Sequence, residues 1–420
     1  MTSNITLEDF ETKAKKWLDE NAQKKPETSK KKAEWGEGEF SVAVFHNLTF
    51  EEERDLLQEA AAWQISKAEH GYHAITWPAE YGGLDLPIEY ARAFASLESG
   101  YITPSRHETF SVTTRLIAPT VLHYGTEDQK NELLSDLFSA KIFCCQLFSE
   151  PGTGSDLAGL GCKAVKDGDE WIINGQKVWS SGAQFSQWGE LIARSHQDQP
   201  KHKGMTAFMV PMDLPGIEIR QIRQMSGGTS FNEVFFSDVR VPDRLRLGSE
   251  GEGWSVALTT LSFERDHSDS DGGGRAGGKW SQLLGTANSL DLLDDPQTRQ
   301  RLMEVYIQTQ IQRLVNRRAA DLRKSGKPPG PEGSLGKLLW TEGMKLMSDV
   351  VSELLGPRLV ADTQTWGTYE WGEHVLGAPG YRIAGGSDEI QRNIIGERVL
   401  GLPKEPDPYK GLPWDEVPKN

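Results

Sequence analysis

Apolar residues recur at helical spacing along the first third of the chain. Leu7, Phe10 and Ala14 follow one another at intervals of three and four residues, and Thr6 precedes them as an N-cap. The same periodicity predicts further helices over residues 50–70, 87–98, 115–122 and 126–138, the last of which opens with a capping box. Together these elements predict an N-terminal helical domain over residues 1–140.

The periodicity changes to two at about residue 141. The apolar run at residues 142–148 predicts a buried strand, and Asn174-Gly175 between two β-rich runs predicts a tight hairpin. Short alternating strands are predicted over residues 170–173, 190–194, 205–210, 216–219 and 233–236. Strands of this length at regular spacing predict a middle β barrel or sandwich over residues 141–245.

Helical periodicity returns after residue 253. Helices are predicted over residues 254–263, 296–324, 333–355 and 387–400. They predict a C-terminal four-helix bundle over residues 246–402, so the fold class is α+β with the order α, β, α. Residues 266–278, rich in Gly, Asp and Ser, predict a flexible loop beside this bundle. Residues 403–420 contain five prolines, and this tail is expected to pack on a neighbour rather than to fold alone.

A tight loop follows the predicted strand at residues 142–148. Residues 149–156 contain one Pro and two Gly, which do not fit inside a helix or a central strand. Ser149 and Ser155 place a hydroxyl at each end of this loop. Such a loop at the lip of a sheet suits a polar heterocycle or an acyl group, and it equally suits an ordinary connection between strands.

Composition and charge exclude several classes of function. The net charge of -15 argues against nucleic acid as a partner, because phosphate binding needs a basic surface. No apolar run approaches the roughly 20 residues that span a bilayer, and no signal peptide is visible, so we expect a cytoplasmic protein. The chain has three cysteines, Cys144, Cys145 and Cys162, without a CxxC pattern, so neither a disulfide framework nor a metal site is expected.

Three stretches resemble the acyl-CoA dehydrogenase family. They are Tyr81-Gly82-Gly83 after a Trp-Pro pair, the run Phe-Ser-Glu-Pro-Gly-Thr-Gly-Ser-Asp at residues 148–156, and the run Ile-Ala-Gly-Gly-Ser-Asp-Glu-Ile-Gln-Arg-Asn at residues 383–393. The α, β, α order is also similar, and the resemblance extends from about residue 50 to residue 402. It implies an FAD enzyme that removes a proton from Cα and a hydride from Cβ of an acyl-CoA thioester.

The same resemblance implies partners and an assembly. The β-hydride would go to flavin N5, and the electrons would pass to an electron-transfer flavoprotein. FAD that is held across subunits implies a homodimer or a homotetramer. The resemblance also gives a set of contacts for each ligand. It implies cofactor contacts from Gln146, Phe148, Ser149, Trp179, Ser181, Gly356, Gly386, Ser387 and Glu389. It implies substrate contacts from Ser155, Ser262, Arg265 and Gly385. An isolated Trp179 could instead be a core residue of the barrel, and Glu389 could instead cap a helix.

The catalytic base departs from the commonest pattern of the family. Gly385 stands where many members carry the catalytic Glu, and its backbone N–H would still be able to hold the thioester carbonyl. A second family arrangement places the base on the helix after the β domain, which corresponds to Glu264 here. A carboxylate against apolar groups has a raised pKa, which suits abstraction of a weakly acidic proton. The alternative for Glu264 is a surface carboxylate beside Arg265, and the rival carboxylates are Asp266, Asp388 and Glu389.

Two further departures concern the part of the site that a neighbouring subunit would complete. Glu353 stands where a neutral Gln often meets the FAD phosphates, and an acid there would repel phosphate. The usual Arg-x-x-Phe-Gly stretch is not recognisable, and Arg275 is a weak substitute. These departures suit a heteromeric assembly. A flavin-dependent monooxygenase, an acyl-CoA oxidase and a non-catalytic partner subunit are therefore alternative functions. The acyl group itself is left open, although the Gly-rich loop suits a bulky one.

Overall fold

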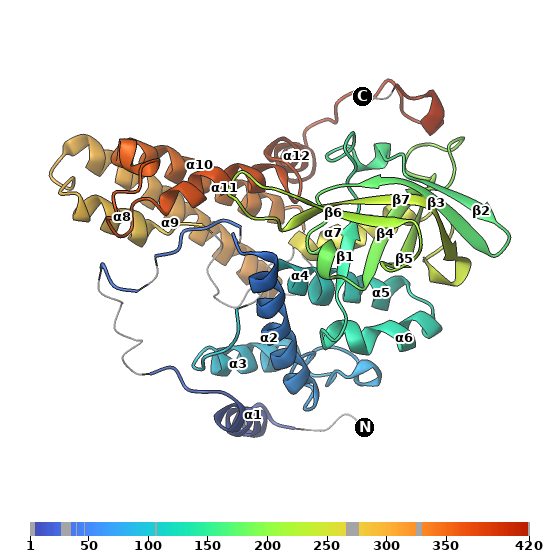
Figure 1. The fold of residues 1–420 in the computed structure, drawn as a ribbon, viewed down its shortest axis with the longest axis horizontal. Coiled ribbons are helices and arrows are strands. Elements are labelled where there is room, and N and C mark those ends of the chain that lie inside the picture. The colour runs from blue at the N-terminus through green and yellow to red at the C-terminus, as the bar shows by residue number, and fades with distance from the viewer. Residues whose placement is uncertain are drawn as a thin grey trace.

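The structure is a computed structural model. It describes residues 5–26, 35–38, 40–45, 47–105, 107–265, 277–324 and 330–418, without the side chains of residues 264, 265, 323 and 324. Most of the loop predicted over residues 266–278, including Arg275 and the rival carboxylate Asp266, therefore lies outside the described residues. Figure 1 shows a sheet on one side, C-terminal helices beside it and N-terminal helices below.

The N-terminal helices form where the sequence provides caps. Their bounds are α1 Leu7–Asn21, α2 Phe50–Ala68, α3 Ile88–Glu98, α4 Glu108–Ser111, α5 Ala118–Tyr124 and α6 Glu127–Phe138, with a π-helical turn at Val112–Ile117. Thr6 caps α1, and full capping boxes open α2 at Thr49 and α6 at Thr126. The predicted N-terminal helical domain is confirmed.

Eight strands form the middle domain. They are β1 Cys144–Leu147, β2 Lys163–Asp167, β3 Glu170–Lys177, β4 Trp188–Arg194, β5 Met205–Pro211, β6 Ile217–Ile222, β7 Phe231–Pro242 and β8 Arg246–Leu247. Their order is β6-β7-β3-β2-β4-β5-β8, and β1 pairs with β4 in parallel. Cys145 and Leu147 face a core within the β domain, whereas Cys144 and Phe148 face a second core shared with α5 and α6.

The predicted hairpin at Asn174-Gly175 is wrong. Strand β3 continues through both residues, and its pairing with β7 shifts in register between Ile173 and Gly175. Gly175 serves a close approach between backbones, since a Cβ there would lie 2.8 Å from Cys162. The Asn174 side chain hydrogen-bonds Asp238 on β7 at 2.9 Å. The turn that joins β2 to β3 lies instead at Gly168, whose φ is +65°.

The C-terminal helices are α7 Gly253–Arg265, α8 Trp280–Ser289, α9 Pro296–Lys324, α10 Gly333–Leu355, α11 Trp371–Ile383 and α12 Asp388–Ile394, which a π-helical turn extends over Ile395–Val399. Helices α8, α9, α10 and α11 of the C-terminal part lie side by side in Figure 1, whereas α7 lies against the sheet. The predicted C-terminal helical domain is confirmed. Helices α8 and α11 were not predicted, and α11 contains Pro379, a residue that normally argues against a helix interior. Among the described helices, none is long and apolar enough to cross a membrane.

The C-terminal tail ends on the β domain of its own chain, which corrects the expectation that it packs on a neighbour. Residues 401–412 are exposed, and the chain is then anchored by the buried Trp414. The Trp414 indole N–H donates to the Gly159 carbonyl at 3.1 Å, and the Arg194 guanidinium lies 4.9 Å from the ring centroid. The Trp414 backbone N–H donates to the Gln199 carbonyl at 2.9 Å. An indole with a buried cation beneath it therefore holds a tail that could not fold alone.

Replacing Trp414 by Ala is expected to release the tail without unfolding the β domain. The lost burial and indole hydrogen bond amount to about 3 kcal/mol. Hydrogen exchange at the amides of Trp414 and Asp415 should therefore accelerate about 10²-fold. Trp414→Phe keeps a ring over Arg194 and should give a smaller acceleration. Unchanged exchange in Trp414→Ala would show that the indole does not hold the tail.

Candidate functional site

A buried ion pair fixes the start of the loop at residues 149–156. The Lys177 side chain is fully buried, and its Nζ donates to the Phe148 carbonyl at 2.9 Å and to Glu150 Oε1 at 2.8 Å. The Glu150 carboxylate also accepts hydrogen bonds from the backbone N–H groups of Gly161, at 2.7 Å, and Cys162, at 2.9 Å. All the polar groups of this pair that the structure describes are thus compensated, which is the condition for a stable buried charge.

The loop itself is a tight turn, as predicted. The backbones of Glu150 and Thr153 exchange hydrogen bonds of 2.9 and 3.0 Å. Ser149 is half-buried and its carbonyl accepts from the Val178 N–H at 2.9 Å, whereas Ser155 is exposed. The loop therefore presents a hydroxyl to solvent at one end and is tied to the end of β3 at the other.

Trp179 follows β3 in a strained and open position. Its φ is +62°, an unusual conformation for a bulky residue, and 59% of its surface is exposed. The interpretation of Trp179 as a core residue of the barrel is therefore wrong. The next residue holds this conformation, because the Ser180 N–H donates to the Asn232 carbonyl at 3.1 Å and the Asn232 side chain donates back at 2.9 Å. The Trp179 ring contacts Phe231 edge-on, with centroids 6.1 Å apart.

Gly182 allows the segment that contains Trp179 and Ser181 to lie against the N-terminal helices. Its φ is +64°, and a Cβ at this position would lie 1.7 Å from Thr109 Oγ1. Thr109 is itself held by His107, which contacts Glu53 at 3.1 Å, and Ser230 donates to the same Glu53 oxygen at 3.0 Å. A buried polar network thus joins α2 to the β domain directly behind the residues predicted to contact flavin.

Replacing Gly182 by Ala is expected to destabilise the protein by about 3 kcal/mol, because the left-handed backbone and the overlap with Thr109 both add cost. Gly168→Ala is a matched control, since its φ is +65° and nothing lies within 4 Å of its Cβ position. The control should cost only about 1 kcal/mol. Urea denaturation of the two variants measures the difference, and equal losses would contradict the overlap.

The turn between α11 and α12 offers a backbone donor. Gly385 and Gly386 have φ values of +65° and +85°. The Gln391 side chain donates to both of their carbonyls, at 3.0 and 3.1 Å, and Lys337 Nζ donates to the Gly386 carbonyl at 2.5 Å. In the described part of the chain, the Gly385 N–H has no acceptor. The two carbonyls are therefore satisfied within the chain, whereas the N–H of the exposed Gly385 is open to solvent or to a ligand.

The geometry of this turn decides whether Glu389 caps α12 and whether Asp388 could be a free base. Ser387 caps α12, since its hydroxyl accepts from the Ile390 N–H at 3.3 Å, so Glu389 is not the cap. The buried Asp388 accepts from Arg382 at 2.7 Å and from Thr341 at 2.7 Å, which gives it a structural role rather than that of a free base. Glu389 is exposed and lies 4.0 Å from Arg392.

A chain of aromatic rings joins the Trp179 segment to the α11–α12 turn. Phe231, which contacts Trp179, also contacts Phe45 at 5.4 Å, and Phe45 stacks on Tyr381 at 4.9 Å. Tyr381 lies in the last turn of α11, shortly before Gly385. The structure thus brings the β-domain loop residues and the glycine turn to one region of the molecule.

Gly356 lies far from this region within the same chain. Gly356 follows the end of α10, and Thr341 in the same helix contacts Asp388 of α12. The 15 residues between Thr341 and Gly356 correspond to about 22 Å along the helix axis. Glu353, one turn earlier, binds Arg301 in a bidentate manner at 2.8 and 2.8 Å, and this bond lowers the pKa of Glu353. The negative charge expected to repel phosphate is therefore countered by an adjacent guanidinium.

Glu264 lies in the last turn of α7, and its side chain is outside the described residues, so its catalytic role stays a prediction. The same holds for the Arg265 side chain. Ser262 is exposed, and its hydroxyl donates to the Thr259 carbonyl at 2.7 Å. Val256 and Ala257 place α7 in the same apolar cluster as Phe148. The helix that carries Glu264 therefore packs against β4 and β5 and shares an apolar cluster with Phe148.

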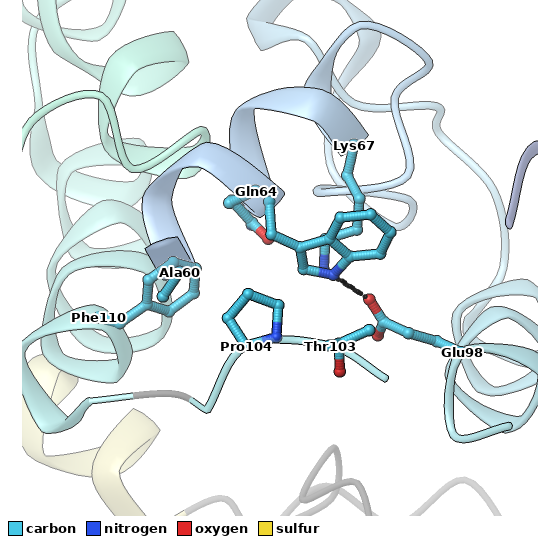
Figure 2. Close-up of a pocket in the computed structure, with 8 residues that line it drawn as sticks. Ala60, Gln64, Lys67, Glu98, Thr103, Pro104 and Phe110 are labelled. Carbon is cyan, nitrogen blue, oxygen red and sulfur yellow. Dashed lines mark hydrogen bonds and ion pairs between the residues drawn. The ribbon is translucent and has the colours of Figure 1, made fainter. Parts of the chain in front are cut away.

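A small cavity lies among the N-terminal helices, away from these residues (Figure 2). Its volume is about 30 Å³, and one wall carries Lys67 and Glu98 with a nitrogen–oxygen distance of 3.2 Å. The Trp63 indole donates to the same Glu98 oxygen at 2.7 Å. This space is sufficient for a water molecule and far too small for an acyl chain.

The cysteines do not supply a nucleophile. Burial raises the pKa of Cys145 to about 12 and that of Cys162 to about 11, and it raises the pKa of Cys144 well above its usual value. Among the described residues, no group of His, Cys, Asp or Glu could hold a metal ion.

Sequence reasoning missed Lys177, Glu150 and Glu190. Lys177 stands in the Asn-Gly-x-Lys motif at residues 174–177, and a Lys at an inward position of a strand was a visible signal for a buried ion pair. Glu190 stands next to Leu, Ile and Ala in a predicted strand, where its charge was equally out of place.

Known proteins resemble this chain along most of its length. Family models for the N-terminal, middle and C-terminal domains of acyl-CoA dehydrogenases match residues 46–141, 145–239 and 251–400. The acyl-CoA dehydrogenase IpdE1 of Mycolicibacterium smegmatis is 35% identical over 364 residues, which cover 84% of this chain and 91% of that protein.

Solved structures are similar in fold. A variant of the Tcur3481-Tcur3483 steroid ACAD matches with a TM-score of 0.70 and 25% identity, covering 95% of this chain and 99% of that chain. The ChsE4-ChsE5 complex from Mycobacterium tuberculosis matches with a TM-score of 0.67 and 24% identity, covering 96% of this chain and 100% of that chain.

Proposed function

The chain belongs to the acyl-CoA dehydrogenase family, and from this premise we propose that it desaturates an acyl-CoA thioester between Cα and Cβ with FAD as cofactor. Glu264 removes the α-proton in this proposal. The observation that carries the assignment of the site is the meeting of the Ser149 loop, the exposed Trp179 and the Gly385 turn in one region.

The residues in this region fit a flavin. The Gln146 side-chain nitrogen is buried and has no hydrogen-bond partner among the described residues. Trp179 offers an open aromatic face, and Ser181 follows it two residues later. Ser149 is joined to the residue before Trp179, because its carbonyl accepts from the Val178 N–H. Phe148, Gly386, Ser387 and Glu389 complete the proposed cofactor contacts within the subunit. When bound, FAD supplies the two-electron acceptor for the hydride from Cβ.

The remaining residues act on the acyl-CoA. The Gly385 N–H donates to the thioester carbonyl and stabilises the negative charge that grows on its oxygen as Glu264 takes the α-proton. Ser155, Ser262 and Arg265 contact the acyl-CoA in the same proposal. The buried ion pair of Lys177 and Glu150 keeps the loop fixed, so that the reacting atoms are held at the correct separation.

A ring-bearing acyl group is the substrate class we favour, because the steroid ACAD variant shares 25% identity and the same fold with this chain. An electron-transfer flavoprotein would receive the electrons. The oxidase alternative differs in its use of O₂, and the monooxygenase alternative has no need of Glu264.

A second subunit completes the proposed cofactor site. Gly356 lies about 22 Å along α10 from the contact with α12, which favours contact with the FAD of a neighbouring subunit. Helix α9 also exposes an apolar stripe at helical spacing, formed by Met303, Ile307, Ile311 and Leu314. A homodimer, a homotetramer or a heteromer would cover it. Two structural neighbours are complexes of two different chains, which supports the heteromeric form.

The decisive experiment is anaerobic reduction of the bound flavin. The FAD-loaded protein is mixed with straight-chain, branched and steroid-ring CoA thioesters, and the loss of visible absorbance is followed. We expect bleaching to be fastest with a ring-bearing thioester. Rapid reoxidation by air would favour the oxidase. A colourless protein that binds no FAD, alone or with a co-expressed partner chain, would refute the proposal.

A further inference from the structure

Glu190 carries a carboxyl group into the interior, and no cation of the described residues pairs with it. It lies on β4 and is fully buried. Its Oε1 lies 2.7 Å from the Thr260 hydroxyl on α7, and its Oε2 has no hydrogen-bond partner among the described residues. Burial raises the pKa of Glu190 to about 8, so the group is mostly a neutral acid at pH 7. A buried polar group of this kind requires a partner for each oxygen.

Gln146 is the neighbour of Glu190 across the parallel pair of β1 and β4. Side chains of paired residues lie on the same face of a sheet, about 5 Å apart at the backbone. Gln146 shares this face with Cys144 and Phe148, because side chains alternate along a strand. Its Nε2 is buried and without a partner in the part of the chain that the structure describes. An unsatisfied donor thus stands beside an unsatisfied oxygen.

The hydrogen-bond capacities of the neutral acid match these neighbours. The Thr260 hydroxyl lies within reach of two acceptors, Glu190 Oε1 at 2.7 Å and the Val256 carbonyl at 3.2 Å, and it has one proton to donate. In the neutral acid, the O–H of Glu190 would donate to Thr260 and leave the Thr260 proton for Val256. The second oxygen of Glu190 would then be a carbonyl free to accept from the neighbouring Gln146 amide, a bond that the structure itself does not form. Thr120 on α5 also contacts Thr260, with 2.9 Å between the two hydroxyl oxygens. A small side-chain adjustment in the neutral form would therefore satisfy both groups that the structure leaves without partners.

We propose that Glu190 is a positioning residue whose carboxyl group couples Gln146 on β1 to Thr260 on α7. This inference rests on the proposed function, because Gln146 is one of the expected flavin contacts and α7 carries Glu264. Glu190 orients the amide of Gln146 and anchors α7 four residues before position 264. It acts through these neighbours and does not touch the reacting atoms.

The proposal also predicts that the stability of the folded protein depends on pH, even without FAD. The folded protein holds the proton of Glu190 up to about pH 8, whereas an unfolded Glu loses it near pH 4.5. Stability contributed by this proton is therefore complete below pH 4.5 and is lost as the pH rises towards 8. Among the described groups packed on Glu190, the titratable one is the Cys144 thiol, whose pKa is raised, so it stays neutral in this range.

Glu190→Gln and Glu190→Met test the proposal. Gln keeps one donor and one acceptor without a charge, whereas Met fills the space with apolar atoms. We expect Glu190→Gln to bind FAD within about 2-fold of the original protein, and Glu190→Met to bind about 3- to 10-fold more weakly with a shifted flavin absorption band, as expected for loss of one hydrogen bond. Gln146→Leu should reproduce the Met variant, and the double variant should add little further loss.

Two results would overturn the proposed coupling. Glu190→Met with unchanged FAD affinity and spectrum would refute it, and so would a Glu190→Gln variant as defective as Glu190→Met. Thermal unfolding from pH 5 to pH 8 gives an independent readout on the protein without FAD. The stability of Glu190→Gln relative to the original protein should increase with pH, and a constant difference would contradict a protonated Glu190. If no FAD binds at all, the proposed function fails while this unfolding test still decides the state of Glu190.

Discussion

Replacing Glu264 by Gln is expected to slow anaerobic flavin reduction by acyl-CoA by about 10²- to 10⁴-fold, the usual contribution of a general base. Gln is isosteric with Glu and cannot accept the α-proton. The proposed flavin contacts lie on other elements, namely β1, the segment after β3 and the α11–α12 turn. FAD should therefore remain bound, with an unchanged visible spectrum before substrate is added.

The matched control for this substitution is Glu252→Gln. Glu252 immediately precedes α7 and is exposed, so it changes the same charge near the same helix without approaching the proposed site. Its bleaching rate should equal that of the original protein. Bleaching that persists in Glu264→Gln would place the base elsewhere, and bleaching lost in both variants would indicate damage to α7.

Replacing Lys177 by Met is expected to lower the free energy of unfolding by about 3–5 kcal/mol, since it leaves the Glu150 carboxylate without its cation in a buried site. Lys177 also holds the Phe148 carbonyl, immediately before Ser149. Loss of this bond should free the loop at residues 149–156. The variant should therefore bind FAD more weakly as well as unfold at lower urea concentration.

Lys67→Met separates these two effects. Lys67 pairs with Glu98 in the N-terminal helices, and the two side chains are only 5% and 11% exposed. The loss of stability should be similar, but FAD affinity should be retained, because this pair lies apart from the proposed flavin region. If Lys177→Met lost stability while binding FAD normally, the ion pair would have no role in holding the loop for the cofactor.

Local sequence signals predicted most of the fold because they act through neighbouring residues. Thr49 and Thr126 open their helices through capping boxes that need only the residue three positions later. Helices α9 and α10 begin and end at the predicted residues, because Pro296 suits a first turn and long apolar periodicity continues to Leu355.

The errors arise where distant parts of the chain decide the structure. Asn174-Gly175 has the composition of a turn, but Cys162 on one side and Asp238 on the other make it a bulge within a strand. Helix α11 keeps Pro379 because the buried Trp371 and Ala378 pack it into the helical domain. Trp414 finds a buried Arg194 that is 220 residues away in the sequence. Periodicity carries no information on such contacts.

The candidate site also divides into residues that local motifs marked and residues whose partners are distant in the sequence. Motifs located the Ser149 loop, Trp179 and the Gly385 turn, because these backbones need particular small or polar residues at fixed spacing. The supporting groups Lys177 and Glu190 could not be paired with their partners from the sequence, since their partners lie on other strands and helices. Only their unusual charge at inward positions of strands marked them.

The anchored tail makes the last residues of the chain a ligand of the β domain that happens to be covalently attached. A protease cut within the exposed residues 401–412 would leave the segment from Pro413 to Pro418 held by the contacts of Trp414 and by the backbone hydrogen bond from Asp415 to Gln197. That segment could then exchange with a synthetic peptide of the same sequence. A fluorophore on such a peptide would report tail docking at equilibrium.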